Sequence, residues 1–168
     1  MKNITVIKNF LEEKKFNLIK SALLEHNFPW YYNDGVIFNN KEGYEDKNNF
    51  QFTHIFFINH FINSNMFNLI KPLIDKINPI SLVRIKANLI TKTNTIIEHE
   101  YHVDYDTEEN MKTAIFYINS NNGYTKFKNG KKIKSEENKL VFFNSKLMHA
   151  GSTCTDEKVR LVINLNYF

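Results

Sequence analysis

Hydrophobic and polar positions alternate with a period of two over most of the chain from Ile80 to Phe168. In one segment, Val83, Ile85 and Ala87 alternate with polar side chains. Because successive side chains of a β-strand point to opposite faces of a sheet, this alternation predicts strands. Segments of this kind lie at residues 82–90, 95–106, 112–120, 124–128, 131–135, 138–144, 147–152 and 159–168. We therefore predict about eight short strands in the second half of the chain.

Two Asn-Gly pairs interrupt this series of strands. One lies in the segment Asn121–Gly123 and the other at Asn129–Gly130, and we expect both to form hairpin turns because Asn and Gly readily adopt positive φ. No helical pattern separates the later strands, which argues against a parallel α/β fold. Many short strands with closely spaced turns predict a β-sandwich or barrel of the jelly-roll kind.

The first part of the chain carries two helical patterns. Hydrophobic residues recur at helical spacing within residues 10–27 and again within residues 64–79. Ser64 is a candidate N-cap of the second helix, and Pro72 lies inside its pattern, so this helix is either kinked at Pro72 or begins there. We expect both helices to pack on one sheet of the jelly roll.

The segments between the two helices are rich in aromatic residues and are expected to hold a short strand or two. His54 and His60 lie there among hydrophobic neighbours, and we interpret both as packed, hydrogen-bonded residues rather than pocket residues.

Nothing in the chain suggests a division into separate domains. There is no repeat, low-complexity tract or linker, and 168 residues provide room for one hydrophobic core. We expect a single domain over residues 1–168, with a helical and aromatic-rich front part at residues 1–79 and a jelly-roll core at residues 80–168.

Charge and composition argue against several classes of partner. The formal net charge is only +4 and comes from scattered lysines. The dense group Lys126–Lys134 has the composition to contact phosphates, but a solvated hairpin whose lysines discourage edge pairing explains it better. We therefore do not expect nucleic acid as a partner. We expect no membrane association and a cytoplasmic location, because no apolar run is long enough to span a bilayer, the N-terminus lacks a secretory signal, and the single Cys154 fits a reducing compartment.

The arginines are unusually few. Of the 22 basic residues, only Arg84 and Arg160 are arginines. A guanidinium binds a carboxylate through two parallel hydrogen bonds, which an ammonium group cannot do. In a lysine-rich chain, each arginine therefore hints at a need for this geometry.

Residues 98–106 concentrate two histidines and four carboxylates. On a strand, His102, Asp104 and Asp106 would share one face, so His102 and Asp104 could bind one ion from adjacent positions. His149 follows a strongly predicted strand, where a jelly roll can return it beside them. Two histidines and one carboxylate form a facial triad, which leaves open positions on a six-coordinate iron.

The other ionisable groups of this segment have weaker claims to be ligands. Glu98 and His99 are interpreted as surface groups or as neighbours of the ligands. Asp106 lies past the end of the predicted strand and is expected in a loop. Glu100 has the parity to face the pocket and is a candidate substrate contact.

Polar residues on the first and last predicted strands add a second group of candidates. Arg160 and Asn164 share a face of the last strand, where Arg160 can form a fork for a distal carboxylate. On the first strand, Arg84 and Lys86 are candidate substrate contacts, although a surface ion pair would explain Arg84 equally well.

The order His102-x-Asp104, His149 and Arg160 resembles that of the 2-oxoglutarate- and Fe(II)-dependent dioxygenases, whose fold is a double-stranded β-helix, a jelly roll. The likeness covers roughly Ile80 to Phe168, and the surrounding sequence resembles small phage-type, prolyl-4-hydroxylase-like members. The resemblance implies that His102, Asp104 and His149 bind Fe(II). It also implies that Arg160 binds the C5 carboxylate of 2-oxoglutarate, whose C1 carboxylate and keto group chelate the metal.

The sequence departs from this family at several positions. Prolyl-hydroxylase-like members often carry a Tyr on the first strand that contacts 2-oxoglutarate, where this chain offers Asn88. Many members have Ser where this chain has Val162, so Asn164 is expected to take that part. Tyr117 is either a core residue or a hydroxyl contact to 2-oxoglutarate. These departures put peptidyl-proline in doubt as the substrate, and Asp104 disfavours halogenation, because related halogenases lack this ligand.

The resulting functional prediction is a cytoplasmic dioxygenase. If the protein belongs to a phage, it would be made in the cytoplasm of the bacterial host. It would use Fe(II), 2-oxoglutarate and O2 to hydroxylate a C–H bond, releasing succinate and CO2. A peptide, a free amino acid, a nucleobase and a small metabolite are all compatible substrates. Two alternatives remain open: a zinc or manganese hydrolase or isomerase that does not use 2-oxoglutarate, and a non-catalytic jelly-roll binding or structural module.

Overall fold

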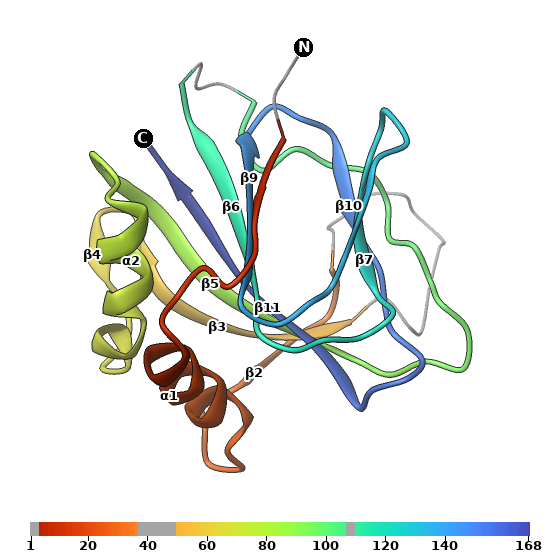
Figure 1. Cartoon of the computed structure of the whole chain (residues 1–168), viewed down its shortest axis with the longest axis horizontal. Coiled ribbons are helices and arrows are strands. Elements are labelled where there is room, and N and C mark those ends of the chain that lie inside the picture. Colours follow the sequence, from red (N-terminus) through yellow and green to blue (C-terminus); the bar gives the residue numbers. More distant parts are fainter. Residues whose placement is uncertain (1–3, 37–49, 107–109) are drawn as a thin grey trace.

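The computed structural model describes residues 4–36, 50–106 and 110–168, and two antiparallel sheets dominate it (Figure 1). The larger sheet contains, in spatial order, β1 (Thr5–Ile7), β9 (Lys139–Asn144), β6 (Lys112–Tyr117), β11 (Val159–Tyr167), β5 (Leu82–Thr91), β3 (Gln51–Ile58) and β2 (Tyr31–Asn33), and β4 (Phe61–Ile62) pairs with β3. The smaller sheet contains β10 (His149–Gly151), β7 (Tyr124–Phe127) and β8 (Lys132–Lys134). The predicted jelly-roll fold is confirmed.

Helices cover the outer face of the larger sheet, as predicted. These are α1 (Glu13–Leu24), the 3-10 helix η1 (Phe67–Ile70) and α2 (Lys71–Ile77), seen on the left of Figure 1, with the smaller sheet on the opposite side. Alternation along β11 explains the layers: Leu161 and Ile163 belong to the core under the helices, whereas Val162 belongs to the core between the sheets. The inner side of the larger sheet is therefore the side that can line a site.

The second helix begins near its proline. Pro72 lies in the first turn of α2, where its missing N–H leaves no hydrogen bond unmade. Ser64 precedes this helical region instead of capping it directly; its hydroxyl accepts a hydrogen bond from the backbone of Met66 (3.0 Å). In the part of the chain that the structure describes, no helix is both long and apolar enough to cross a membrane.

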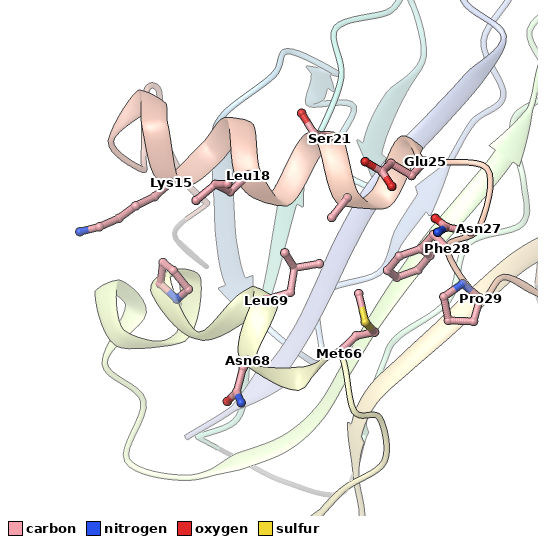
Figure 2. Close-up of a pocket in the computed structure, with 12 residues that line it drawn as sticks. Lys15, Leu18, Ser21, Glu25, Asn27, Phe28, Pro29, Met66, Asn68 and Leu69 are labelled. Carbon is pink, nitrogen blue, oxygen red and sulfur yellow. The ribbon is translucent and has the colours of Figure 1, made fainter.

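A groove runs between α1 and the η1–α2 segment on the outer face (Figure 2). Its lining is largely apolar and includes Leu18, Met66 and Leu69, with Lys15 and Glu25 among its few charged groups. None of its lining residues belongs to the pocket described below. The groove is therefore a feature of the helical layer.

The front part of the chain contributes strands as well as helices. β2, β3 and β4 supply the short strands expected in the aromatic-rich segments, and β1 pairs with β9 at the other edge. The largest contribution is β3, which pairs along its length with β5. The larger sheet thus includes strands from both sides of residue 80.

The two histidines of the aromatic-rich segments differ in environment. His54 is packed and hydrogen-bonded as predicted, with ring nitrogens 2.8 Å from the carbonyl of Pro29 and 2.8 Å from the hydroxyl of Ser64. The same prediction is wrong for His60, which is exposed. Asn59 and His60 form the two-residue turn between β3 and β4 with φ of 51° and 67°, and such a hairpin turn requires positive φ at both positions.

Residues 95–106 do not form the predicted strand. They make two isolated β-bridges, Glu98 with Ser152 and His102 with His149. The polar side chains of this segment have partners on different sheets: Glu98 binds Lys126 of β7, and Asp104 binds residues of the larger sheet. A regular strand cannot serve both sets of partners, so the backbone runs beside β10 without continuous pairing.

The two Asn-Gly pairs also have different roles. Gly130 has a φ of 87° in the turn between β7 and β8, so the predicted hairpin at Lys126–Lys134 is confirmed. The hairpin prediction for Asn121–Gly123 is wrong, because this segment connects β6 of the larger sheet to β7 of the smaller one. Gly123 does not have a positive φ; a Cβ there would lie 2.7 Å from Cδ of Arg160, so close approach explains the glycine.

Candidate active site

His102, Asp104 and His149 meet at one end of the space between the sheets. One ligand atom from each lies within 4.8 Å of the others. The two histidines face each other across a bridge in which each backbone N–H donates to the other carbonyl, at 2.9 and 3.0 Å, and their ring centroids are 4.5 Å apart. The backbone thus holds both rings side by side. The structure brings together the three residues that the sequence nominated for a metal.

Hydrogen bonds to the backbone orient both rings. Nδ1 of His149 lies 2.9 Å from the carbonyl of Leu147, and Nδ1 of His102 lies 3.4 Å from that of Glu100. An Nδ1–H that donates to a carbonyl leaves Nε2 with the lone pair that a metal requires. Burial, followed by the neighbouring His149, lowers the pKa of His102 to about 4, so this imidazole is neutral near pH 7.

Three side chains hold the carboxylate of Asp104, which is only 4% exposed. Oδ2 accepts hydrogen bonds from the hydroxyl of Thr113 (2.7 Å) and from Nδ2 of Asn166 (3.0 Å), and Oδ1 accepts one from Nη2 of Arg84 (3.3 Å). Burial raises the pKa of Asp104, but His149, Arg84 and Thr113 together outweigh it and hold the pKa below its ordinary value. The carboxyl is therefore an anion ready to bind a cation.

Arg160 is buried at the other end of the same pocket, with 3% exposure. Its Nε donates to the hydroxyl of Ser135 (2.9 Å) and its Nη2 to that of Thr125 (3.2 Å). Burial lowers the pKa of the Arg160 guanidinium, although Tyr117 opposes this effect. Among the described residues, no carboxylate pairs with Arg160, so its two identified partners are neutral hydroxyls. A buried guanidinium in this state is a receptor for an anion.

The predicted residues of β5 and β11 line this pocket. They include Arg84, Lys86 and Asn88 of β5 and Asn164 of β11. Oδ1 of Asn164 is buried and has no hydrogen-bond partner within the described chain. Burial lowers the pKa of Lys86 to about 8. The pocket therefore joins a cluster of metal-binding groups, a buried guanidinium and further polar side chains.

Other candidates lie outside the pocket lining. Tyr117 is fully buried; its hydroxyl donates to Thr125 (2.8 Å) and its ring lies 5.7 Å from Cζ of Arg160, so it supports the arginine from behind. Glu100 is exposed and does not line the pocket. Asp106 is exposed beyond the last β-bridge of its segment, in the loop position expected for it. Glu98 forms ion pairs with lysines of the β7–β8 hairpin, as expected for a surface group.

Sequence reasoning missed four polar residues of the site. Thr113 and Asn166 hold Asp104, and Ser135 and Thr125 bind Arg160. One signal was available for Asn166, which continues the face of β11 that carries Arg160 and Asn164. The other three lie on segments whose neighbours only the strand pairing defines.

No family model matches the sequence, and no curated protein matches it. Solved structures do match the fold. A prolyl hydroxylase from Trichoplax adhaerens, in complex with a peptide of hypoxia inducible factor, matches with a TM-score of 0.70 and 14% identity over 100% of this chain and 84% of its own. A viral collagen prolyl hydroxylase from Paramecium bursaria Chlorella virus-1, in complex with 2-oxoglutarate, gives a TM-score of 0.58 and 17% identity over 98% of this chain and 95% of its own.

A third match, HygX from Streptomyces hygroscopicus, was solved with nickel and 2-oxoglutarate bound. Its TM-score is 0.61 and its identity 11%, over 99% of this chain and 82% of its own. At these identities the comparison establishes the fold. The chain has the jelly-roll fold of the prolyl hydroxylases and of other proteins that bind 2-oxoglutarate, as the resemblance in its sequence implied.

Proposed function

We propose that this chain is an Fe(II)- and 2-oxoglutarate-dependent dioxygenase that hydroxylates a C–H bond. One observation carries the proposal: a single pocket holds the cluster of His102, Asp104 and His149 together with Arg160, a buried guanidinium that has no carboxylate partner among the described residues. A metal hydrolase or isomerase would need the first feature and not the second.

The three clustered residues suit Fe(II). Two imidazoles and one carboxylate form the facial set that leaves open positions on a six-coordinate iron. When bound, Fe(II) supplies the oxidising chemistry, in which O2 and 2-oxoglutarate are consumed and succinate and CO2 are released. The chain orients both imidazoles through their Nδ1 hydrogen bonds and keeps the carboxylate of Asp104 in one rotamer through Thr113 and Asn166.

Arg160 is proposed to bind the distal carboxylate of 2-oxoglutarate. Its burial strengthens the attraction, and Ser135 and Thr125 hold the guanidinium in place before the anion arrives. The amides of Asn88 and Asn164 line the same pocket and can donate to the co-substrate. Tyr117 would act through Arg160 and Thr125, since its hydroxyl already donates to Thr125.

The substrate class is a separate question. Two of the matched structures are prolyl hydroxylases, one of them bound to a peptide and one described as acting on collagen. In this chain the side of the pocket formed by β5 carries three polar side chains, Arg84, Lys86 and Asn88. This polarity supports a substrate other than peptidyl-proline.

The proposal is tested by anaerobic titration of the Fe(II)-loaded protein with 2-oxoglutarate, following the visible absorption of the chelate. Arg160→Ala is expected to weaken 2-oxoglutarate binding by two to three orders of magnitude. The loss of one member of a buried charge pair costs about 3–5 kcal/mol, and about 1.4 kcal/mol corresponds to a tenfold change in Kd. Arg160→Lys should recover part of the affinity, because one ammonium cannot reproduce the fork.

Iron binding should survive both substitutions, because Arg160 touches none of the three clustered residues. Unchanged 2-oxoglutarate affinity in a folded Arg160→Ala protein contradicts the proposal. Tight binding of zinc, with no binding of 2-oxoglutarate by the wild-type protein, would favour the hydrolase or isomerase alternative.

A further inference from the structure

Lys86 is a partly buried lysine with no hydrogen-bond or ion-pair partner among the residues that the structure describes. Its side chain lines the pocket, and within the described residues it forms neither a hydrogen bond nor an ion pair. Lys139, the other lysine with a largely buried side chain (7% exposed), forms an ion pair with Glu136 at 2.8 Å and donates to the carbonyl of Lys134 at 2.9 Å. The fold therefore satisfies a buried ammonium elsewhere and leaves that of Lys86 available.

Arg84, two residues away on the same face of β5, also has unused donors. Its Nε donates to Asn166 (3.1 Å) and its Nη2 to Asp104 (3.3 Å), and its side chain is 22% exposed. Its Nη1 donates to no described residue, and a guanidinium carries five N–H donors. Arg84 and Lys86 thus present a fork and a point charge to one side of the pocket.

The charges of the described lining residues do not balance. Three cations, Arg84, Lys86 and Arg160, face one carboxylate, Asp104, among the lining residues that the structure describes. Counted over these four side chains, the lining carries two excess positive charges. Fe(II) and the 2-oxoglutarate dianion add opposite and equal charges, so the same excess remains in the loaded site. Partly buried positive charge without a counter-ion is unfavourable.

The register of the strands separates the two ends of this charge. Arg160 lies opposite Ile90 of β5, whereas Lys86 and Arg84 lie opposite Asn164 and Asn166. Lys86 is four residues from Ile90, which is about 13 Å along a strand. Arg84 and Lys86 therefore belong to the end of the pocket that holds Asp104, away from the site proposed for the distal carboxylate of 2-oxoglutarate.

We infer that the substrate carries an oxyanion, a carboxylate or a phosphate group, which binds between Arg84 and Lys86 beside the metal site. This inference rests on the proposed function and deepens it by naming a substrate class. Guanidinium and ammonium groups both form charge-assisted hydrogen bonds with oxyanions, and a partly enclosed pocket strengthens them. A substrate so anchored would present its neighbouring C–H bonds to the metal.

A direct test uses inorganic phosphate and acetate as probes. The protein is loaded with Mn(II) and 2-oxoglutarate without O2, and the paramagnetic relaxation of the phosphate 31P and acetate 13C nuclei is measured. The wild-type protein is expected to enhance the relaxation of at least one probe, and the stronger effect identifies the preferred oxyanion. Lys86→Met and Arg84→Met should each weaken probe binding by about tenfold, the effect of losing about 1.4 kcal/mol.

The matched control is Lys131→Met, the same change at an exposed lysine of the β7–β8 hairpin, which should leave probe binding unaltered. An enhancement that is equal in wild type and Lys86→Met would mean that the probe binds the manganese itself, and this result overturns the inference. No enhancement for either probe in the wild type overturns it too.

Turnover separates this inference from the proposed function. Succinate release is measured with matched pairs of compounds: amino acids and peptides with a free or amidated carboxylate, and nucleotides beside their nucleosides. Stimulation by the anionic member alone, reduced at least about tenfold in Lys86→Met, supports the inference. Equal stimulation of succinate release by the neutral member would contradict the inference. Throughout, 2-oxoglutarate binding by the wild type is the separate readout, since its absence contradicts the proposed function itself.

Discussion

At the scale of single residues, the carboxylate of Asp104 shows how the fold prepares a ligand. A free carboxylate can rotate and can bind a metal through one oxygen or two. Here Thr113 and Asn166 both donate to Oδ2, which leaves Oδ1 with the single, longer bond from Arg84. This division favours binding through Oδ1 alone and fixes the direction from which the carboxylate approaches.

Removing the hydroxyl of Thr113 tests this arrangement. Thr113→Val keeps the shape of the side chain and deletes the 2.7 Å hydrogen bond to Asp104. Metal affinity should fall by 10- to 100-fold, the usual order for groups that orient a ligand. Competition with a chromophoric chelator measures the change. Thr5→Val, the same substitution at an exposed position of β1, is the control and should bind metal like the wild type.

Gly123 provides a second test at this scale. A Cβ at this position would lie 2.7 Å from Cδ of Arg160 and 2.7 Å from the carbonyl of Thr153. Gly123→Ala should therefore displace Arg160 and weaken 2-oxoglutarate binding by about tenfold or more while metal binding persists. In Gly130→Ala the backbone is strained by its φ of 87°, but nothing lies within 4 Å of the added Cβ. Loss of stability without loss of 2-oxoglutarate affinity is expected there; equal effects of the two substitutions would contradict the role given to Gly123.

The candidate ligands were predictable because their residue types and order are visible in the chain. His102, Asp104 and His149 were nominated from the sequence, and the structure brings them together. Thr113 was not, because a lone threonine carries no signal until the pairing of β6 with β11 places it beside Asn166. Contacts across the sheet depend on register, which the alternation of one strand does not define.

At the scale of elements, period-two alternation succeeded where a strand has two distinct environments. It identified β5, β6, β9 and β11. In each of these strands one face points toward the outer side of the larger sheet and the other face points toward the smaller sheet. It failed for residues 95–106, where alternation reflects ligands and ion pairs instead of sheet pairing. The front strand β3 was only loosely expected, because its hydrophobic residues do not alternate regularly and its pairing with β5 shifts register between Ile55 and Phe57.

Glu98 links two of these elements and gives a prediction about pH. Its carboxylate binds Lys126 (2.6 Å) and Lys132 (2.9 Å) of the β7–β8 hairpin, and these bonds, with that from Tyr124, lower the pKa of Glu98 from 4.5 to about 2. The link is complete above pH 4.5, the ordinary pKa, and is lost as pH falls through the folded-state pKa of about 2.

Titration of the Glu98 carboxyl, followed by its 13C chemical shift, should show this low midpoint. Lys126→Met should raise the midpoint toward the ordinary value, and added salt should also raise it, because salt screens ion pairs near the surface. A midpoint near 4.5 in the wild type would mean that Glu98 does not pin the hairpin in solution.

At the scale of the whole molecule, the three clustered residues connect parts that are far apart in the sequence. His102 and Asp104 lie between β5 and β6, whereas His149 begins β10 of the smaller sheet. A ligand that binds the folded state alone stabilises it by mass action, about 2.7 kcal/mol at a concentration one hundred times Kd. A bound metal should therefore stabilise the folded state by joining the segment of His102 and Asp104 to the smaller sheet.

Thermal unfolding measures this effect. At one hundred times Kd, Fe(II) under anaerobic conditions, or Mn(II), should raise Tm by about 5–10 °C for a chain of this size. His149→Ala should abolish the increase. His60→Ala removes an exposed histidine far from the cluster in sequence and should retain it. An equal increase in the His149→Ala protein would show that the metal binds elsewhere.

The bridge between His102 and His149 has a consequence for the exchange of amide hydrogens with solvent. The carbonyl of each histidine accepts a hydrogen bond from the backbone N–H of the other, so neither amide proton can exchange until this contact between the two residues opens. Both amide protons should therefore exchange through the same opening, with the same opening free energy, when the segment separates from β10. The amide signals of His102 and His149 therefore report the opening of the candidate metal cluster, even in the absence of metal.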